Sequence, residues 1–144
     1  MHTSNARLVI GSACALWAAG ELAGLLPHFV DDVVFTVHAR PRAPSMLGEG
    51  LGKVLLARRF EAMLDEVEVQ AFKLQKHSYA TDGFWHYSRA AYRYRHHASG
   101  MIIEGSMRNR WGFVGTRIAH FEVFHDSDRM RAFLDVAGLA ACDT

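Results

Sequence analysis

The chain has few residues that could crosslink it. Of its 144 residues only two are cysteines, Cys14 and Cys142, one near each end. Two isolated thiols exclude a disulfide-rich scaffold and a CxxC motif, and they favour a reducing compartment. The composition also lacks a dominant sign of charge, because 16 basic residues face 15 acidic ones. No global field therefore favours nucleic acid or an acidic membrane.

Long apolar runs are absent too, and no stretch reaches the length that spans a membrane. Residues 7–15 resemble a short signal peptide, but the apolar pattern continues past Glu21 into Leu22, Leu25 and Leu26. That continuation is typical of an amphipathic helix, so we expect a cytoplasmic protein. The chain has no repeats or linkers, half of it is hydrophobic and 22% is charged. This balance predicts one globular domain over residues 1–144.

The order of elements predicts an α+β fold. Three helices are expected at residues 4–19, 21–29 and 51–65, with a strand at 33–38 between the second and third. Asp31 and Asp32 are expected to break the pattern before that strand, and residues 39–50, rich in proline and glycine, are expected to form a loop. Residues 66–78 alternate loosely, and a turn is expected at 81–83. Strands at 84–98, 101–114 and 118–124 then form an antiparallel meander, followed by a short helix from Ser127 or Asp128 through Leu134.

Ser99 and Gly100 are a tight-hairpin signal between two long strands. If they are the two turn residues, Ala98 faces Met101, and the alternation of side chains sorts the hairpin into two faces. The inner face is aromatic with isolated polar groups: Ala90, Tyr92, Tyr94, His96, Met107, Asn109 and Trp111. The outer face is charged: Arg89, Arg93, Arg95, Glu104 and Arg110. In this register Arg95 lies opposite Glu104 and Tyr94 opposite Gly105.

The next turn, at Gly115, leaves two registers open. A three-residue turn places Arg108 opposite Glu122 and brings Phe121 to the inner face, opposite Asn109. A two-residue turn instead brings His120 inside, beside Trp111. The first is preferred because it pairs opposite charges.

Four stretches resemble the nuclear-transport-factor-like superfamily, in its ketosteroid-isomerase-like and SnoaL-like polyketide cyclase branch. Residues 18–35 resemble its "AGDLDALLALFADDVVF" start, and Gly50 followed by Val54 resembles its entry into the third helix. Residues 111–118 resemble its glycine turn, and residues 124–134 its closing strand and helix. The resemblance implies a curved mixed or antiparallel sheet wrapped around three N-terminal helices, which leaves a conical pocket. It also implies a homodimer through the outer sheet face.

The catalytic residues of the steroid isomerases are largely missing from the matching positions. The general-base aspartate falls on Val37, and the phenolic oxyanion donor falls on Ala13. The second donor, a protonated aspartate, falls on Asn109, and a supporting tyrosine falls on Arg58. Valine cannot move a proton and alanine cannot stabilise an enolate, so this mechanism is not expected here.

Two functions therefore stay open. One is a cofactor-free isomerase, cyclase or dehydratase acting on a hydrophobic metabolite, with Asn109, Tyr92, Tyr94 and His96 as candidate catalytic residues. It requires that Asn109, Tyr94 and His96 converge on one cavity. The other is a binding or dimerisation module that has lost the chemistry. In both, the residues expected to contact the ligand are Trp17, Phe35, Val37, Arg58, Ala90, Met107, Trp111 and Phe121.

Each candidate also has an ordinary structural interpretation. Asn109 could be a satisfied structural amide, and Tyr92 and Tyr94 could be core aromatics with one polar end. His38 is expected at the surface, because it points away from Val37. No HxH, HExxH or Cys/His cluster is present, so no metal is expected.

The arginines of the outer face could suggest nucleic acid. That face carries Glu104 and Glu122, however, and no interleaved exposed aromatic residues are expected there. A dimer interface is therefore preferred, formed by Arg93, Arg95, Glu104, Arg108, Arg110 and Glu122.

Overall fold

The computed structural model describes residues 3–38, 48–79 and 84–125. The predicted turn at 81–83 and the predicted C-terminal helix ending at Leu134 lie outside these residues. The elements are α1 (Thr3–Ala18), α2 (Leu22–Leu25), the 3-10 turn η1 (Leu26–His28), β1 (Phe29–His38), β2 (Gly48–Leu51), α3 (Lys53–Glu66), β3 (Val67–Tyr79), β4 (Trp85–His96), β5 (Ile102–Val114) and β6 (Arg117–His125). No helix in these ranges is both long and apolar enough to cross a membrane.

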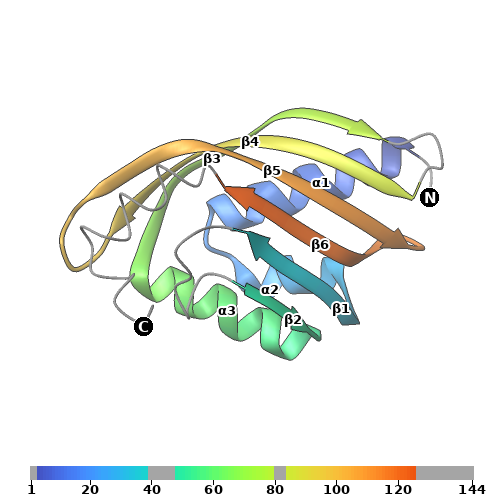
Figure 1. Ribbon diagram of the computed structural model, residues 1–144, viewed down its shortest axis with the longest axis horizontal. Helices are drawn as coiled ribbons and strands as arrows, with labels where there is room; N and C mark the ends of the chain where they lie inside the picture. Colours follow the sequence, from blue (N-terminus) through green and yellow to red (C-terminus); the bar gives the residue numbers. More distant parts are fainter. Residues whose placement is uncertain (1–2, 39–47, 80–83, 126–144) are drawn as a thin grey trace.

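The strands form one open, mixed sheet in the order β2-β1-β6-β5-β4-β3. β1 runs parallel to β6, and every other neighbouring pair is antiparallel. The sheet arches over the helices, which lie on its concave side (Figure 1). The hydrophobic core fills the space between them, so the predicted α+β class and curved sheet are confirmed.

The end of α1 shows why the chain turns back under the sheet. Gly20 has a φ of +70°, which a residue with a Cβ rarely adopts. Its N–H donates to the carbonyl of Trp17, and the N–H of Glu21 donates to the carbonyl of Leu16. These two bonds form a Schellman motif, which closes the helix and sends the chain into α2.

One prediction around the first strand is met only in part, and another is wrong. β1 begins at Phe29, so Asp31 and Asp32 lie within the strand. Its pairing with β6 is nevertheless interrupted between Phe29, which pairs with Ile118, and Val34, which pairs with His120, so the two aspartates lie at an irregularity of the strand. The loop expected at residues 39–50 ends in a strand, because residues 48–51 pair with β1 as β2.

Gly50 of β2 lies against the ring of Phe35, one of the most deeply buried side chains. A Cβ at this position would come within 2.4 Å of Phe35 Cζ and 2.8 Å of Leu55 Cδ2. We expect Gly50→Ala to lower the free energy of unfolding by about 1–3 kcal/mol, the usual effect of overpacking.

Gly11 provides the matched control, because a Cβ there meets nothing within 4 Å in the middle of α1. Gly11→Ala should raise stability by up to about 1 kcal/mol, since alanine favours helix. Urea unfolding of both variants measures the difference. Equal stability of the two would contradict the close packing of Gly50 against Phe35.

The β4–β5 hairpin keeps its predicted faces but not its predicted pairs. His96 bonds to Met101, and a four-residue loop of residues 97–100 replaces the two-residue turn. Each facing pair is therefore displaced by two residues: Arg93, not Arg95, lies opposite Glu104, and Tyr92, not Tyr94, lies opposite Gly105. A displacement of two preserves the alternation, so the aromatic face still points inward.

The β5–β6 connection differs from both registers that the sequence left open. The turn has two residues, yet a bulge between Gly112 and Phe113 displaces the pairing again. As a result Phe121 faces inward beside Trp111, as preferred, whereas His120 does not line the cavity. The preferred pairing of Arg108 with Glu122 is wrong, because Glu122 lies opposite Arg110.

Glu122 is the centre of a charged cluster on the outer face. Arg110 forms an ion pair with it, and His120 and His38 lie 2.9 and 3.2 Å from its oxygens. Burial alone would raise the pKa of this carboxyl, but the hydrogen bonds from these three partners lower it to about 2. His38 therefore lies on the outer face, as expected, and Arg110 also covers the ring of Trp85 at 4.1 Å.

Candidate functional site

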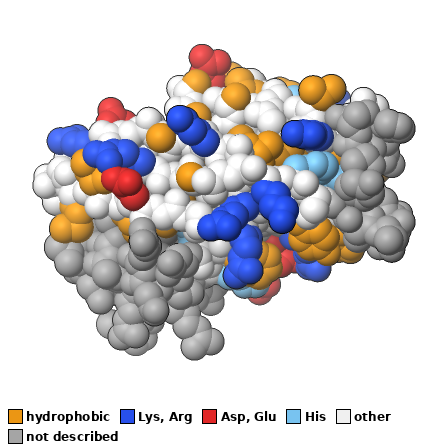
Figure 2. Space-filling view, turned by 90° about the horizontal axis from the view of Figure 1, so that it is seen from above, with side chains coloured by type: hydrophobic (Ala, Val, Ile, Leu, Met, Phe, Trp, Pro, Cys, Tyr) orange, Lys and Arg blue, Asp and Glu red, His pale blue; other side chains and the backbone are white. Residues whose placement is uncertain are grey.

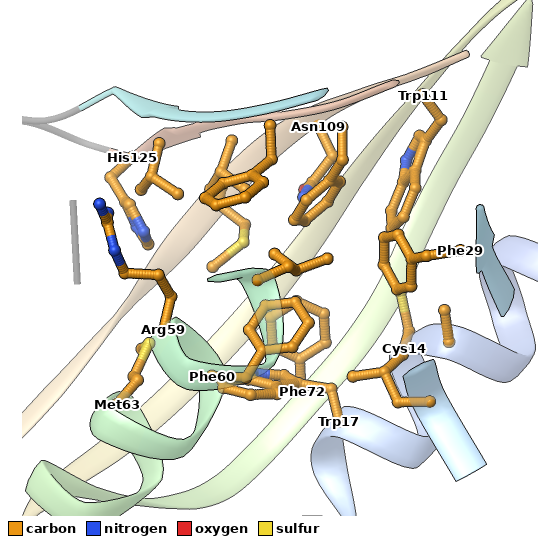
Figure 3. Close-up of a pocket in the computed structure, with 18 of the residues that line it drawn as sticks. Cys14, Trp17, Phe29, Arg59, Phe60, Met63, Phe72, Asn109, Trp111 and His125 are labelled. Carbon is orange, nitrogen blue, oxygen red and sulfur yellow. The ribbon is translucent and has the colours of Figure 1, made fainter. Parts of the chain in front are cut away.

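An apolar cavity lies between the concave face of the sheet and the helices (Figure 3). Its walls come from every layer of the fold. Helix α1 contributes Ala13, Cys14 and Trp17, and α3 contributes Leu56, Arg59, Phe60 and Met63. The remaining side chains come from α2 and the strands: Leu25, Phe29, Phe35, Val37, Phe72, Tyr94, Met107, Asn109, Trp111, Phe121, Val123 and His125.

The spacing of these residues explains why they share the cavity. On α3 they recur every three or four positions, which is the spacing of one helix face. On β5 and β6 they recur every second position, as at Phe121, Val123 and His125, which is the spacing of one sheet face. The curvature of the sheet then brings these faces around one space.

Aromatic rings form most of the cavity's inner surface. Phe29 contacts Phe60 and Phe121 edge to face, with centroids 6.2 and 5.9 Å apart. Trp17 packs on Phe60 at 5.2 Å, and Trp111 packs on Phe121 at 4.7 Å. Such pairs hold the rings rigidly, so the cavity walls are largely preformed.

The size of the cavity limits what it can hold. Its volume is about 90 Å³, and one water-sized atom needs about 10–15 Å³ on this kind of measure. The cavity as it stands therefore has room for roughly six to nine non-hydrogen atoms. A single ring with a small substituent is of this size, whereas a four-ring steroid is too large unless side chains move.

Tyr94 carries a hydroxyl group in this apolar wall. Burial raises its pKa well above the ordinary value, so the phenol keeps its proton. The indole N–H of Trp17 donates to the Tyr94 oxygen at 3.3 Å. Because this bond uses an oxygen lone pair, the hydroxyl proton remains available to an acceptor in the cavity.

Asn109 presents an unpaired oxygen to the same space. Its side chain is buried, and Oδ1 has no hydrogen-bond partner within the described part of the chain. Leaving a buried acceptor unpaired costs about 1–3 kcal/mol. Such a group in a cavity is typical of a position that bonds to a ligand or to water.

His125 is the third polar group, on the same wall as Asn109 (Figure 3). Its Nδ1 is buried and has no partner among the described residues. Burial lowers the pKa of His125 to about 4, so the imidazole is neutral at pH 7. A neutral imidazole has one nitrogen that accepts a proton and can act as a base.

The other titratable groups at the cavity do not suit nucleophilic or metal chemistry. Burial raises the pKa of Cys14 to about 12, which keeps its thiol protonated and unreactive. No group of three or more potential metal ligands occurs in residues 3–38, 48–79 and 84–125.

Several predicted site residues lie at the cavity. Tyr94 and Asn109 line it, and so do six of the predicted ligand contacts: Trp17, Phe35, Val37, Met107, Trp111 and Phe121. Val37 and Ala13, which match the base and phenol positions of the steroid isomerases, are also at the wall. The cavity therefore presents apolar groups at the two positions where that mechanism needs acid–base groups.

The predicted site residues His96, Tyr92 and Ala90 do not line the cavity. His96, which was predicted on the inner face as a catalytic residue, is buried at the hairpin end, where its ring bonds to Ser99 at 2.7 Å and lies 3.5 Å from Glu66. The convergence of Asn109, Tyr94 and His96 is therefore not formed, so the enzyme that the sequence predicted with these three residues is not supported, and catalysis in this cavity would need another polar group in place of His96. Tyr92 and Ala90 face inward and are buried but do not line the cavity, and the Tyr92 ring packs against two residues that do, Tyr94 at 4.8 Å and His125 at 5.7 Å.

The arginine at the cavity is Arg59, not the predicted Arg58. Arg58 is exposed, whereas Arg59 lines the cavity and lies 5.9 Å from the ring of Phe35. Helical spacing from Leu56 to Phe60 and Met63 places Arg59 on the inner face, so the signal was present in the sequence. His125 could have been found in the same way, by counting in twos from Phe121.

No protein-family model matches this chain, and no curated protein is significantly similar to it in sequence. Solved structures do match. A candidate isomerase from Bacillus subtilis has a TM-score of 0.76 at 10% identity, covering 85% of this chain and 88% of its own. A candidate polyketide cyclase from Pseudomonas putida KT2440 has a TM-score of 0.71 at 14% identity, with 85% and 92% covered.

A third structure carries a small ligand. It is a protein with a ketosteroid-isomerase-like fold from Catenulispora acidiphila, in complex with trimethylamine. Its TM-score is 0.73 at 16% identity, and the match covers 94% of this chain and 96% of the other. Identities this low concern the fold and carry no activity over. The chain has the fold of the nuclear-transport-factor-like and ketosteroid-isomerase-like proteins, as its sequence motifs predicted.

Proposed function

We propose that this cavity binds a small, mostly apolar carbonyl compound and isomerises it by moving a proton next to the carbonyl group. The observation that carries the proposal is the presence of three polar groups in one apolar cavity, each with hydrogen-bonding capacity to spare. Tyr94 offers a proton, Asn109 offers an unpaired oxygen, and His125 offers a neutral imidazole. Small-molecule sites typically combine an apolar wall with a few such groups.

In the proposed reaction His125 removes a proton from a carbon next to the carbonyl. The electron pair of that C–H bond moves toward the carbonyl oxygen, which accepts a hydrogen bond from the Tyr94 hydroxyl. The proton then returns to a different carbon, so that a double bond changes position. Atoms and electrons balance without an oxidant, a reductant or a cofactor. A base of low pKa is sufficient where a donor stabilises the enolate.

A non-catalytic binding module is the second candidate. The apolar side chains of Val37 and Ala13 favour it, because they occupy the two positions where steroid isomerases carry their base and phenol. In this case the same cavity would hold the ligand, and His125 would serve only to orient it.

One experiment separates the two candidates. The protein is incubated in D₂O with single-ring ketones whose double bond is not conjugated to the carbonyl. Ligand binding is followed by the fluorescence of Trp17 and Trp111, and isomerisation and deuterium uptake are followed by NMR. We expect binding together with deuterium uptake beside the carbonyl. Binding without uptake would leave the non-catalytic module, and no binding of any ring of this size would refute both.

A further inference from the structure

Arg59 is the one permanently charged side chain among the described residues that line the cavity. It extends from α3 toward the sheet and reaches the same end of the cavity as His125, whereas Trp111 and Cys14 lie at the other end (Figure 3). Its guanidinium carbon is 5.9 Å from the centre of the Phe35 ring, which is within the range of a cation–π contact. This contact holds a positive charge at the end of the cavity where the proposed base lies.

The other titratable groups of the cavity wall are uncharged at pH 7. Burial keeps the Cys14 thiol and the Tyr94 phenol protonated by raising their pKa values, and it keeps the His125 imidazole neutral by lowering its pKa. No aspartate or glutamate is among the described residues that line the cavity. The described wall therefore carries one positive charge and no negative charge, and a charge acts more strongly in an apolar cavity than in water.

The other lysines and arginines that the structure describes are placed differently. None of them lines this cavity, and several are gathered on the outer face of the sheet, where water solvates them (Figure 2). Arg58, the neighbour of Arg59 on α3, is likewise exposed. Moving a charged side chain from water to an apolar wall costs free energy that packing alone does not return. The position of Arg59 therefore favours a role in holding an anionic group of a ligand.

Geometry and size favour a carboxylate as this anionic group. A guanidinium has five N–H donors in a planar fork, so Arg59 can keep its contacts within the protein and still hold a carboxylate through two parallel hydrogen bonds. The cavity has room for roughly six to nine non-hydrogen atoms, which one small ring with a carboxylate fills. A phosphate ester of the same ring is larger and carries up to about two negative charges, against which the described wall offers one cation.

We propose that Arg59 binds the carboxylate of a small cyclic acid and thereby selects an anionic ligand for this cavity. The inference rests on the binding function proposed above, and it narrows the substrate class to a keto acid built on one small ring. The carboxylate would lie at the His125 end of the cavity, and the ring would lie against the aromatic wall toward Trp111. In this orientation Arg59 determines specificity and takes no part in the proton transfer.

The test compares three ligands of the same shape and different charge. Benzoate, benzamide and benzamidine are anionic, neutral and cationic at pH 7, and their binding to the full-length chain is followed by the fluorescence of Trp17 and Trp111. We expect benzoate to bind about tenfold or more tightly than benzamide, the usual gain from a charge-assisted hydrogen bond, and benzamidine to bind most weakly.

The matched variants are Arg59→Gln and Arg58→Gln, which remove the same charge from adjacent positions of α3. Arg59→Gln should abolish the preference for benzoate, because glutamine keeps a polar side chain but no charge. Arg58→Gln should preserve the preference, because Arg58 is exposed and does not line the cavity. Thermal unfolding checks that both variants are folded, and the comparison of the three ligands on the wild type needs no variant.

Two results would overturn this inference alone. The first is benzamide binding to the wild type as tightly as benzoate, and the second is an undiminished preference for benzoate in Arg59→Gln. Either result leaves the proposed isomerase activity standing, because deuterium uptake from neutral ketones tests that activity separately. Failure of all three ligands to bind would overturn both proposals, since the cavity would then not hold a ring of this size.

Discussion

Replacing His125 by glutamine should lower the rate of deuterium uptake by a factor of about 10²–10⁴, the usual contribution of a general base. Glutamine keeps a polar side chain of similar size but cannot accept the proton, so ligand binding should change only a few-fold. The control is His97→Gln, because His97 is exposed and bonds to the carbonyl of Leu64. The deuterium-uptake rates of both variants are measured by NMR and compared with the wild-type rate. A His125→Gln variant with the wild-type rate would exclude His125 as the base.

The pH dependence provides a second measurement of the same group. Burial lowers the pKa of His125 to about 4, so the deuterium-uptake rate should be level above about pH 5 and fall as the pH passes below 4.

The same lowered pKa makes stability depend on pH. The folded chain protonates His125 less readily than the unfolded chain, in which a histidine has a pKa near 6.5. The stability that neutral His125 contributes is thus complete above pH 6.5 and is lost as the pH falls toward 4. His125→Gln should remove this part of the acid sensitivity, and urea unfolding of wild type and variant at several pH values measures it.

Replacing Asn109 by leucine should stabilise the protein while weakening ligand binding. Leucine is similar in size and removes the buried oxygen that has no partner among the described residues. The expected gain in the free energy of unfolding is about 1–3 kcal/mol, which is the cost of leaving such a group unpaired. The orienting hydrogen bond to a ligand would be lost, so affinity should fall about tenfold.

Ser88→Ala is the control for Asn109→Leu. Its hydroxyl accepts a hydrogen bond of 2.9 Å from the Trp111 indole, so its removal leaves a buried donor unpaired and should cost stability. Urea unfolding and fluorescence titration measure both variants. If Asn109→Leu loses stability as Ser88→Ala does, Asn109 is a structural amide and not a ligand contact.

The candidate site was only partly predictable from the sequence. Alternation identified the inner faces of β4 and β5, so Tyr94, Asn109 and Trp111 were placed correctly at the cavity. Alternation does not indicate how far along a strand the cavity extends, and for that reason His96 was included and His125 was missed. His96 lies at the end of β4, where Ser99 and Glu66 hold it in local contacts away from the cavity.

The sequence by itself determined the class of fold and the faces of its strands. The period of two separates aromatic from charged side chains, and the motifs from Ala18 to Phe35 and around Gly115 identify the order of elements. Only the tertiary structure decided the strand register, because a displacement of two residues leaves every side chain on its predicted face. The loop closed at Gly100, with a φ of +72°, and the bulge after Gly112 set that displacement. They thereby decided that Arg89 faces Arg108 on the outer face and that Glu122 pairs with Arg110.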